Sequence, residues 1–204
     1  MIADYRIYPN AKHPDPAADI RDAAAWVVAH ADEITKDEPV KLDVSKIFIL
    51  GHSAGATITT TLFLEPDLLP PKSDLHSRIK GIIPMAGVYH FRGVNAINAD
   101  VVDAYYGTTE EERRQKETLG LLETASPELL AALPPILATV SELEDPRVEV
   151  THWDFLKVLK EKVLNPVDDF VMKGQNHVSV MDTLMSGEGE DWAYNVVEWM
   201  RSKL

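Results

Sequence analysis

A short apolar run, followed at once by a turn of small residues and a helix, constrains the fold of this chain more than any other feature. Residues 46–50 (KIFIL) are predicted to form a buried strand, because the run is short and apolar and stops at Gly51. Residues 54–64 follow as a predicted helix that ends before Pro66. This order of elements is typical of a parallel sheet whose strands are joined through helices.

The same alternation of strands and helices continues along the chain. Further strands are predicted at residues 79–85, 135–140 and 167–172, and amphipathic helices at 15–33, 151–162 and 191–202. Residues 100–133 are mostly helical and charged and lie between two strands, so an insertion or cap is expected at about 90–133. We predict a single α/β domain over residues 1–204, with a mostly parallel sheet and helices on both faces.

The composition excludes several classes of protein and of site. The 204 residues are 45% hydrophobic and 26% charged, as in a globular protein. The absence of cysteine excludes a disulfide framework, a thiolate zinc site and a cysteine nucleophile. The net charge of −13 disfavours nucleic acid and anionic membranes as partners. Because no apolar run could span a bilayer and residues 1–6 show no signal-peptide pattern, we expect a cytoplasmic protein.

Residues 51–55 (GHSAG) match the pattern G-x-S-x-G between a predicted strand and a predicted helix, the setting that the pattern requires. Ser53 would project from a sharp, strained turn, and the residues two before and two after it must be small because larger side chains would collide there. The start of the helix offers free N–H groups, so the N–H of Ala54 is expected to face a developing oxyanion. We interpret Ser53 as the candidate nucleophile and His52 as a packing residue. The alternative is a glycine-rich turn with an incidental serine.

A serine nucleophile needs a base within hydrogen-bond reach, and one histidine stands where such a base is expected. Enzymes with this strand-to-helix turn have the order nucleophile, acid, histidine, with the histidine after the last strand. Of the seven histidines, His177 fits that position, since it follows the strand at 167–172 through residues 173–176 (KGQN). We predict that His177 is the base, with a solvated loop histidine as the alternative.

The acid that orients the histidine should follow the strand at 135–140, where residues 141–146 read SELEDP. Asp145 is the first choice, because an aspartate before proline suits an extended loop. Glu144 is the second choice, because glutamate also serves as a triad acid and stands one residue nearer to the strand. Glu142 is the third choice. For each of the three carboxylates, the alternative is a solvated side chain in an acidic loop.

Taken in order, these segments resemble esterases related to hormone-sensitive lipase and kynurenine formamidase. The resemblance rests on residues 4–9 (DYRIYP), 13–14 (HP), 51–55, 141–146 and 174–179 (GQNHVS), and the ending at 186–192 (SGEGEDW) is similar to fungal members. It implies an α/β-hydrolase fold and hydrolysis of carboxylic esters, or of an activated amide, by a Ser-His-acid triad without metal or organic cofactor. The family has Gly or Ser, two further residues and then Asp at the acid. Counting from Ser141 places Glu144 at that position.

The chain departs from this family at its front. In such enzymes the first strands and a His-Gly-Gly loop, which supplies further oxyanion donors, precede the segment that corresponds to residues 4–9. This chain begins with Met1-Ile2-Ala3 and contains no Gly-Gly pair. We therefore expect an N-terminally truncated sheet with an exposed edge, which raises the hypothesis of a homo-oligomer formed through that edge.

The sequence leaves the substrate open beyond a small-molecule ester or amide. One alternative function is that of a catalytically weak or inactive relative that acts as a binding or interaction domain. Another, still among the hydrolases, is that of an arylformamidase. Tyr105 and Tyr106 are candidates to line the substrate pocket, and a purely structural tyrosine pair is an equal alternative.

Overall fold

A computed structural model of the chain describes residues 1–93 and 99–204. The described residues form a parallel sheet in which the strands lie side by side in the order of the sequence. They are β1 (Ile47–His52), β2 (Ile79–Met85), β3 (Ile136–Leu143) and β4 (Val167–Asn176). Successive right-handed crossovers in one direction place the connecting helices on one face of such a sheet. The predicted α/β class with a parallel sheet is confirmed.

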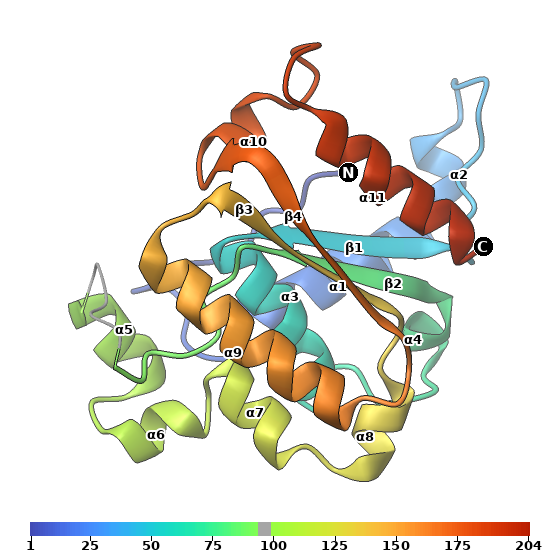
Figure 1. The fold of residues 1–204 in the computed structure, drawn as a ribbon. Coiled ribbons are helices and arrows are strands. Elements are labelled where there is room, and N and C mark those ends of the chain that lie inside the picture. Colours follow the sequence, from blue (N-terminus) through green and yellow to red (C-terminus); the bar gives the residue numbers. More distant parts are fainter. Residues whose placement is uncertain (94–98) are drawn as a thin grey trace.

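Helices cover both faces of the sheet, as predicted (Figure 1). One face is covered by α1 (Asp15–Ala29), α3 (Ala54–Leu64), α7 (Thr118–Thr124), α8 (Pro127–Ala132) and α9 (Pro146–Lys162). The other face is covered by α10 (Ser179–Asp182) and α11 (Asp191–Ser202). The remaining helices are α2 (Ala31–Ile34), α4 (Asp74–Arg78), α5 (Ala99–Tyr106) and α6 (Glu110–Arg114).

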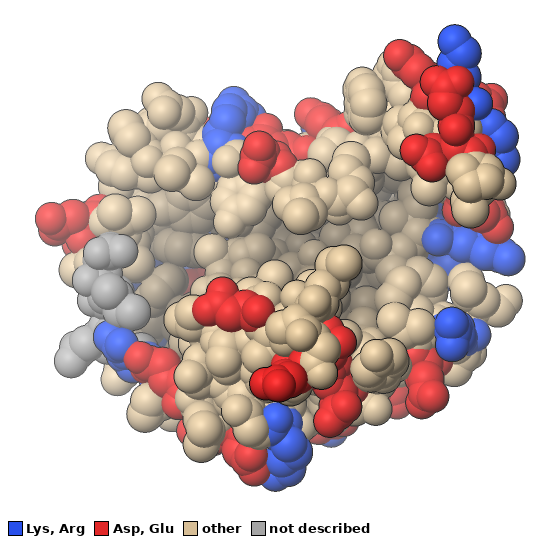
Figure 2. Space-filling view, turned by 90° about the horizontal axis from the view of Figure 1, so that it is seen from above, with Lys and Arg blue, Asp and Glu red and all other residues tan. Residues whose placement is uncertain are grey.

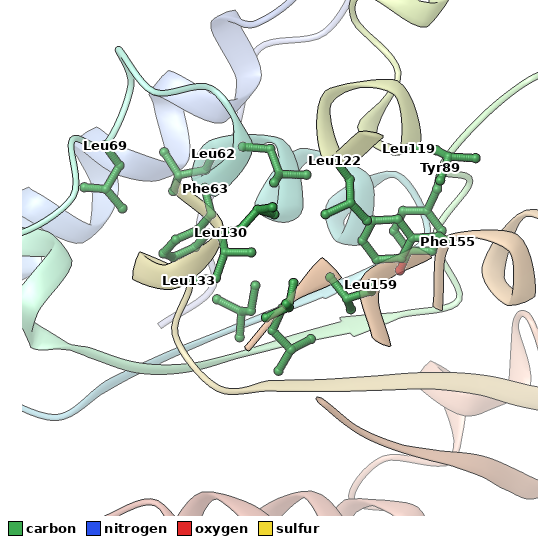
Figure 3. Close-up of a cluster of buried hydrophobic side chains, with 14 of the residues drawn as sticks. Leu62, Phe63, Leu69, Tyr89, Leu119, Leu122, Leu130, Leu133, Phe155 and Leu159 are labelled. Carbon is green, nitrogen blue, oxygen red and sulfur yellow. The ribbon is translucent and has the colours of Figure 1, made fainter. Parts of the chain in front are cut away.

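The larger of two apolar cores lies between the sheet and the helices on the face of α3 and α9 (Figure 3). Neighbouring residues of a strand point to opposite faces, so Ile82 packs into this core and Ile83 into the smaller one under α11. At one end of the larger core, Tyr89 stacks on Phe155 with ring centroids 4.0 Å apart. The sheet is therefore held from both sides, which fixes the ends of its strands in space.

The described part of the predicted insertion at about 90–133 contains short helices, α5 to α8. Residues 94–98 of that insertion lie outside the described residues. Helices α7 and α8 join the core beneath the sheet, whereas α5 and α6 lie to its side (Figure 1).

Strands β3 and β4 are longer than predicted, and the loop after β3 is correspondingly shorter. The two strands remain paired as far as Leu143 and Asn176, beyond the predicted ends at 140 and 172. Helix α9 begins at Pro146 instead of residue 151, because the side chain of Asp145 caps it by accepting from the N–H of Arg147 (2.9 Å). Residues 144 and 145 thus form a short corner between a strand and a helix.

No helix within residues 1–93 and 99–204 is both long and apolar enough to cross a membrane. From above, the surface is hollowed in its middle, and most of the side chains around the hollow are uncharged (Figure 2). Lys and Arg lie scattered among Asp and Glu on this face (Figure 2). Among the described residues that this view shows, Lys and Arg form no continuous basic patch (Figure 2).

Candidate active site

Ser53 stands on the sharp turn that joins β1 to α3. Its backbone angles are φ 54° and ψ −122°, a conformation that residues other than glycine rarely adopt. The backbone N–H of Ser53 donates to the carbonyl of Met85 at the end of β2 (2.9 Å), which ties the turn to the sheet. Such strain persists where the surrounding structure over-determines it, and it concentrates at functional sites.

The two glycines of the turn have different surroundings. A Cβ atom added to Gly51 would lie 2.3 Å from the carbonyl oxygen of Gly55, so any side chain at position 51 would collide with the first turn of α3. Apart from the adjacent residues and the backbone of its own helix, a Cβ atom added to Gly55 would have no neighbour within 4 Å. The expected collision is therefore present at Gly51, whereas at Gly55 a Cβ alone meets no neighbour.

His177 lies between Ser53 and a buried carboxylate. Its Nε2 is 2.9 Å from Ser53 Oγ, and its Nδ1 is 2.8 Å from Glu144 Oε1. A carboxylate at Nδ1 favours a proton on that nitrogen, which leaves Nε2 to accept from the serine hydroxyl. The contact with Glu144 raises the pKa of His177 above its usual 6.5, although burial opposes the rise.

Glu144 is enclosed at the corner between β3 and α9. Its side chain is 0% exposed, and its Oε1 also accepts the backbone N–H of Asp145 (2.9 Å). Burial opposes ionisation of this carboxyl, but the contacts with His177 and the Asp145 N–H outweigh it and hold its pKa below the usual 4.5. An ionised carboxylate at this place can stabilise a positive charge on His177.

The other two candidate acids point elsewhere. Asp145, the first choice from the sequence, caps α9 and forms an ion pair with Arg147, which holds the pKa of Asp145 well below its usual range. Glu142 is bound to Lys173 Nζ (2.7 Å) and accepts the N–H of Gly174 (2.9 Å), so it joins β3 to β4. The structure therefore brings Glu144, the second choice, to the histidine.

The loop that presents His177 is held by its own polar side chains. Asn176 Oδ1 accepts the N–H groups of Val178 and Ser179, each at 2.9 Å. The buried Gln175 accepts the Ser179 hydroxyl (2.8 Å) and donates to the carbonyl of Gly189 (2.7 Å). These bonds fix the backbone on both sides of His177 and so limit where its ring can lie.

His52 packs against His177, and Ala54 begins the helix beside Ser53. The two imidazole rings have centroids 4.7 Å apart, and no hydrogen bond joins them among the described residues. Burial lowers the pKa of His52, which favours its neutral form. Because Ala54 is the first residue of α3, its N–H belongs to the free N–H groups at the positive end of the helix.

A mostly apolar cavity of about 380 Å³ opens beside Ser53 and Ala54. Tyr105 and Tyr106 both line the cavity and also pack against each other. The two tyrosines therefore fit both interpretations from the sequence, that of pocket residues and that of a structural pair. Sequence reasoning missed the wall formed by the N-terminal segment, which contributes Tyr5 and Tyr8. Two tyrosines three residues apart were a visible signal, but nothing local indicated that this segment lies beside residue 53.

Comparisons with known proteins agree with this architecture. The family described as alpha/beta hydrolase fold matches residues 1–181. The probable carboxylic ester hydrolase LipM of Mycobacterium tuberculosis is 32% identical over 94 residues, which are 45% of this chain and 20% of that protein. The non-reducing polyketide synthase ascC of Acremonium egyptiacum is 37% identical over 71 residues, which are 33% of this chain and 3% of that protein.

Solved esterase structures have the same fold. An esterase of the fungus Rhizomucor miehei superposes with a TM-score of 0.72 at 19% identity, over 98% of this chain and 62% of its own. Carboxyl esterase 2 of Tuber melanosporum gives 0.62 at 18% identity, over 95% and 64%. The chain thus spans less than two thirds of the length of these relatives. The predicted likeness to esterases of this fold is confirmed, and the match over residues 1–181 shows that the chain belongs to the α/β-hydrolase fold family.

Proposed function

We propose that this chain is a serine hydrolase that cleaves carboxylic esters, or an activated amide, with Ser53, His177 and Glu144 as its triad. One observation carries the proposal: Ser53 Oγ, the imidazole of His177 and the buried Glu144 carboxylate form a continuous series of contacts at 2.9 and 2.8 Å. The likeness to a probable carboxylic ester hydrolase and to solved esterases supports the same reaction class.

In the proposed reaction, Ser53 Oγ attacks the substrate carbonyl while its proton passes to His177 Nε2. The oxygen of the tetrahedral intermediate gains negative charge and accepts the N–H of Ala54, and Glu144 stabilises the imidazolium. His177 then returns the proton to the leaving alcohol or amine, which leaves an acyl group on Ser53. Water, activated by neutral His177, adds to this acyl group and releases the acid.

The nucleophile is tested with p-nitrophenyl acetate and a fluorophosphonate probe. We expect turnover of the ester and covalent labelling at Ser53, and we expect Ser53→Ala to lose both. Unchanged turnover in Ser53→Ala would exclude Ser53 as the nucleophile. An unlabelled Ser53 in folded protein would favour the alternative, a binding or interaction domain of this fold. Comparison of N-formylkynurenine with simple esters tests the arylformamidase alternative.

The acid is tested with two neighbouring substitutions. Glu144→Gln keeps the size of the side chain and removes its charge, so kcat should fall by about 10³- to 10⁴-fold, as is usual when a triad carboxylate becomes an amide. Asp145→Asn should change kcat by less than about tenfold, because its carboxylate contacts Arg147 and the start of α9. The reverse order of effects would assign the acid to Asp145.

The pH profile gives a second readout of the same assignment. His177 must be neutral to accept a proton, so the acidic limb of kcat/KM should lie above pH 6.5, the usual pKa of histidine. In the residual activity of Glu144→Gln, that limb should move to lower pH, because the contact that raises the pKa of His177 is lost. A limb that does not move would argue against the pairing of Glu144 with His177.

A further inference from the structure

The cavity beside Ser53 has one wall made of consecutive aromatic rings. Phe91 and Tyr106 have ring centroids 5.2 Å apart at 55°, and Tyr106 and Tyr105 have centroids 4.7 Å apart at 69°. All three residues line the cavity, although Phe91 follows β2 and the two tyrosines end α5. The tilted geometry is the one that aromatic pairs prefer, since it sets the positive edge of one ring against the negative face of the next.

Buried contacts behind this wall hold it in place. The backbone N–H of Phe91 donates to Glu117 Oε1 (2.9 Å), and the side chain of Glu117 is only 2% exposed. Behind Tyr105 lies His13, whose side chain is 5% exposed and whose ring meets that of Tyr105 edge-on at 5.7 Å. Burial lowers the pKa of His13 to about 4, so the wall is backed by a neutral ring near neutral pH. Such a wall is pre-organised, which favours binding of a matching group.

The rest of the cavity suits a small apolar group. Tyr5 and Tyr8 add aromatic surface from the N-terminal segment, and the ion pair of Asp145 and Arg147 leaves no uncompensated charge on that side. The volume of about 380 Å³ is near the lower end of the roughly 300–1,000 Å³ that is usual for ligand pockets. A single aromatic ring fits within this volume.

We propose that this cavity is a subsite for a single aromatic ring of the substrate, and that Phe91 and Tyr106 select that ring over a saturated ring of similar size. The inference rests on the proposed function, since it names the substrate class of the same site. A saturated ring buries similar apolar area but lacks the charge distribution that favours edge-to-face contact. The selection is therefore expected to appear in the ratio of kcat/KM for an aromatic substrate to kcat/KM for the matching saturated substrate.

The test compares two pairs of esters in which only the ring differs. Phenyl acetate and cyclohexyl acetate place the ring on the alcohol side, whereas methyl benzoate and methyl cyclohexanecarboxylate place it on the acyl side. Intrinsic reactivity differs within each pair, so the measured quantity is the change in the kcat/KM ratio, aromatic over saturated, between variant and wild type. The pair whose ratio changes identifies the side of the ester that occupies the cavity.

Phe91→Leu and Tyr106→Leu each remove one ring and keep an apolar side chain. We expect each to lower the ratio by about 3- to 10-fold in one pair, which corresponds to the loss of one aromatic contact. The matched control is Ile58→Leu, which alters a non-aromatic wall of the same cavity and should leave both ratios unchanged. Ratios that stay at the wild-type value in both leucine variants, for both pairs, would overturn the inference.

A binding measurement separates this inference from the proposed function. In Ser53→Ala, benzyl alcohol and cyclohexylmethanol are titrated by NMR, so that no turnover is needed. Phe91→Leu in that background should raise the Kd of benzyl alcohol by about 3- to 10-fold and leave that of cyclohexylmethanol nearly unchanged. An equal change for both ligands would overturn the ring selectivity even if esters are hydrolysed. If benzyl alcohol shows the expected difference but the probe does not label Ser53 in the wild type, the proposal of an aromatic subsite stands and the proposed hydrolase function is refuted.

Discussion

At the scale of single residues, the backbone of Ser53 is the most informative feature. A positive φ at a serine is held by the hydrogen bond to Met85 and by the start of α3, and it lifts the hydroxyl toward His177. The same residue could adopt a relaxed conformation only if the turn changed shape. The strained backbone at Ser53 therefore lowers the stability of the fold and places the serine Oγ at the histidine.

This strain predicts a stability difference between two inactive variants. Ser53→Gly and Ser53→Ala both lose the hydroxyl, but only glycine adopts φ 54° without steric cost. Ser53→Gly should therefore be more stable than Ser53→Ala by about 1 kcal/mol, measured by urea unfolding at pH 7. Equal stabilities, or a more stable alanine variant, would show that the turn is not strained at this residue.

Glu144 and Asp145 show how much depends on one position. Both are acidic, both follow β3, and both lie near His177, but their side chains leave the backbone in different directions. The Glu144 side chain is buried and contacts His177, whereas the Asp145 side chain pairs with Arg147 and caps α9. The residue types alone favoured Asp145, whereas the end of β3 and the beginning of α9 bring Glu144 into contact with His177.

At the scale of elements, the turn between β1 and α3 depends on close approach at one glycine. The helix begins so near to the strand that Gly51 faces the backbone of Gly55. Gly55 itself lies within the first turn of α3, in helical backbone and with open space where a Cβ would be.

The two glycines therefore predict opposite outcomes for the same substitution. Gly51→Ala places a Cβ 2.3 Å from the Gly55 carbonyl oxygen. It should therefore destabilise the fold by about 2 kcal/mol, which is usual for overpacking, and it should also lower kcat. Gly55→Ala should fold normally and gain up to about 1 kcal/mol from the better helix former. Urea unfolding and ester turnover measure both effects. Equal sensitivity at both positions would contradict the observed geometry.

At the scale of the whole molecule, burial of histidines makes stability depend on pH. The side chain of His13 is 5% exposed and His152 as a residue is 1% exposed. Burial lowers the pKa of each to about 4, below the value near 6.5 of an unfolded chain. The unfolded state therefore binds more protons between these values, so stability is lost as the pH falls from 6.5 toward 4.

This linkage predicts a smaller pH dependence in His152→Leu than in the wild type. From pH 7 to pH 5, neutral burial of one such histidine should account for about 2 kcal/mol of lost stability. The unfolding free energy of His152→Leu should fall by that much less over the interval, whatever its value at pH 7. The control is His30→Gln, which replaces a half-buried histidine whose ring is hydrogen-bonded to the carbonyl of Trp26. Identical pH slopes in His152→Leu and wild type would contradict the prediction.

The sequence alone determined the features that depend on neighbours along the chain. The run at 46–50, the glycines of the turn and the helix at 54–64 place Ser53 between a strand and a helix, and the order of elements predicts the parallel sheet. His177 could also be named, because its position after the last strand follows from that order.

Tertiary structure decided the features that depend on residues far apart in the chain. Pairing of β3 with β4 as far as Leu143 shortens the following loop, and this register sets Glu144 against a histidine 33 positions away. The cavity likewise combines Tyr5 and Phe91 with α5, because long-range packing of the core brings these segments beside Ser53. Local patterns hold information on backbone conformation, whereas the direction and environment of a side chain at the end of a strand depend on what packs there.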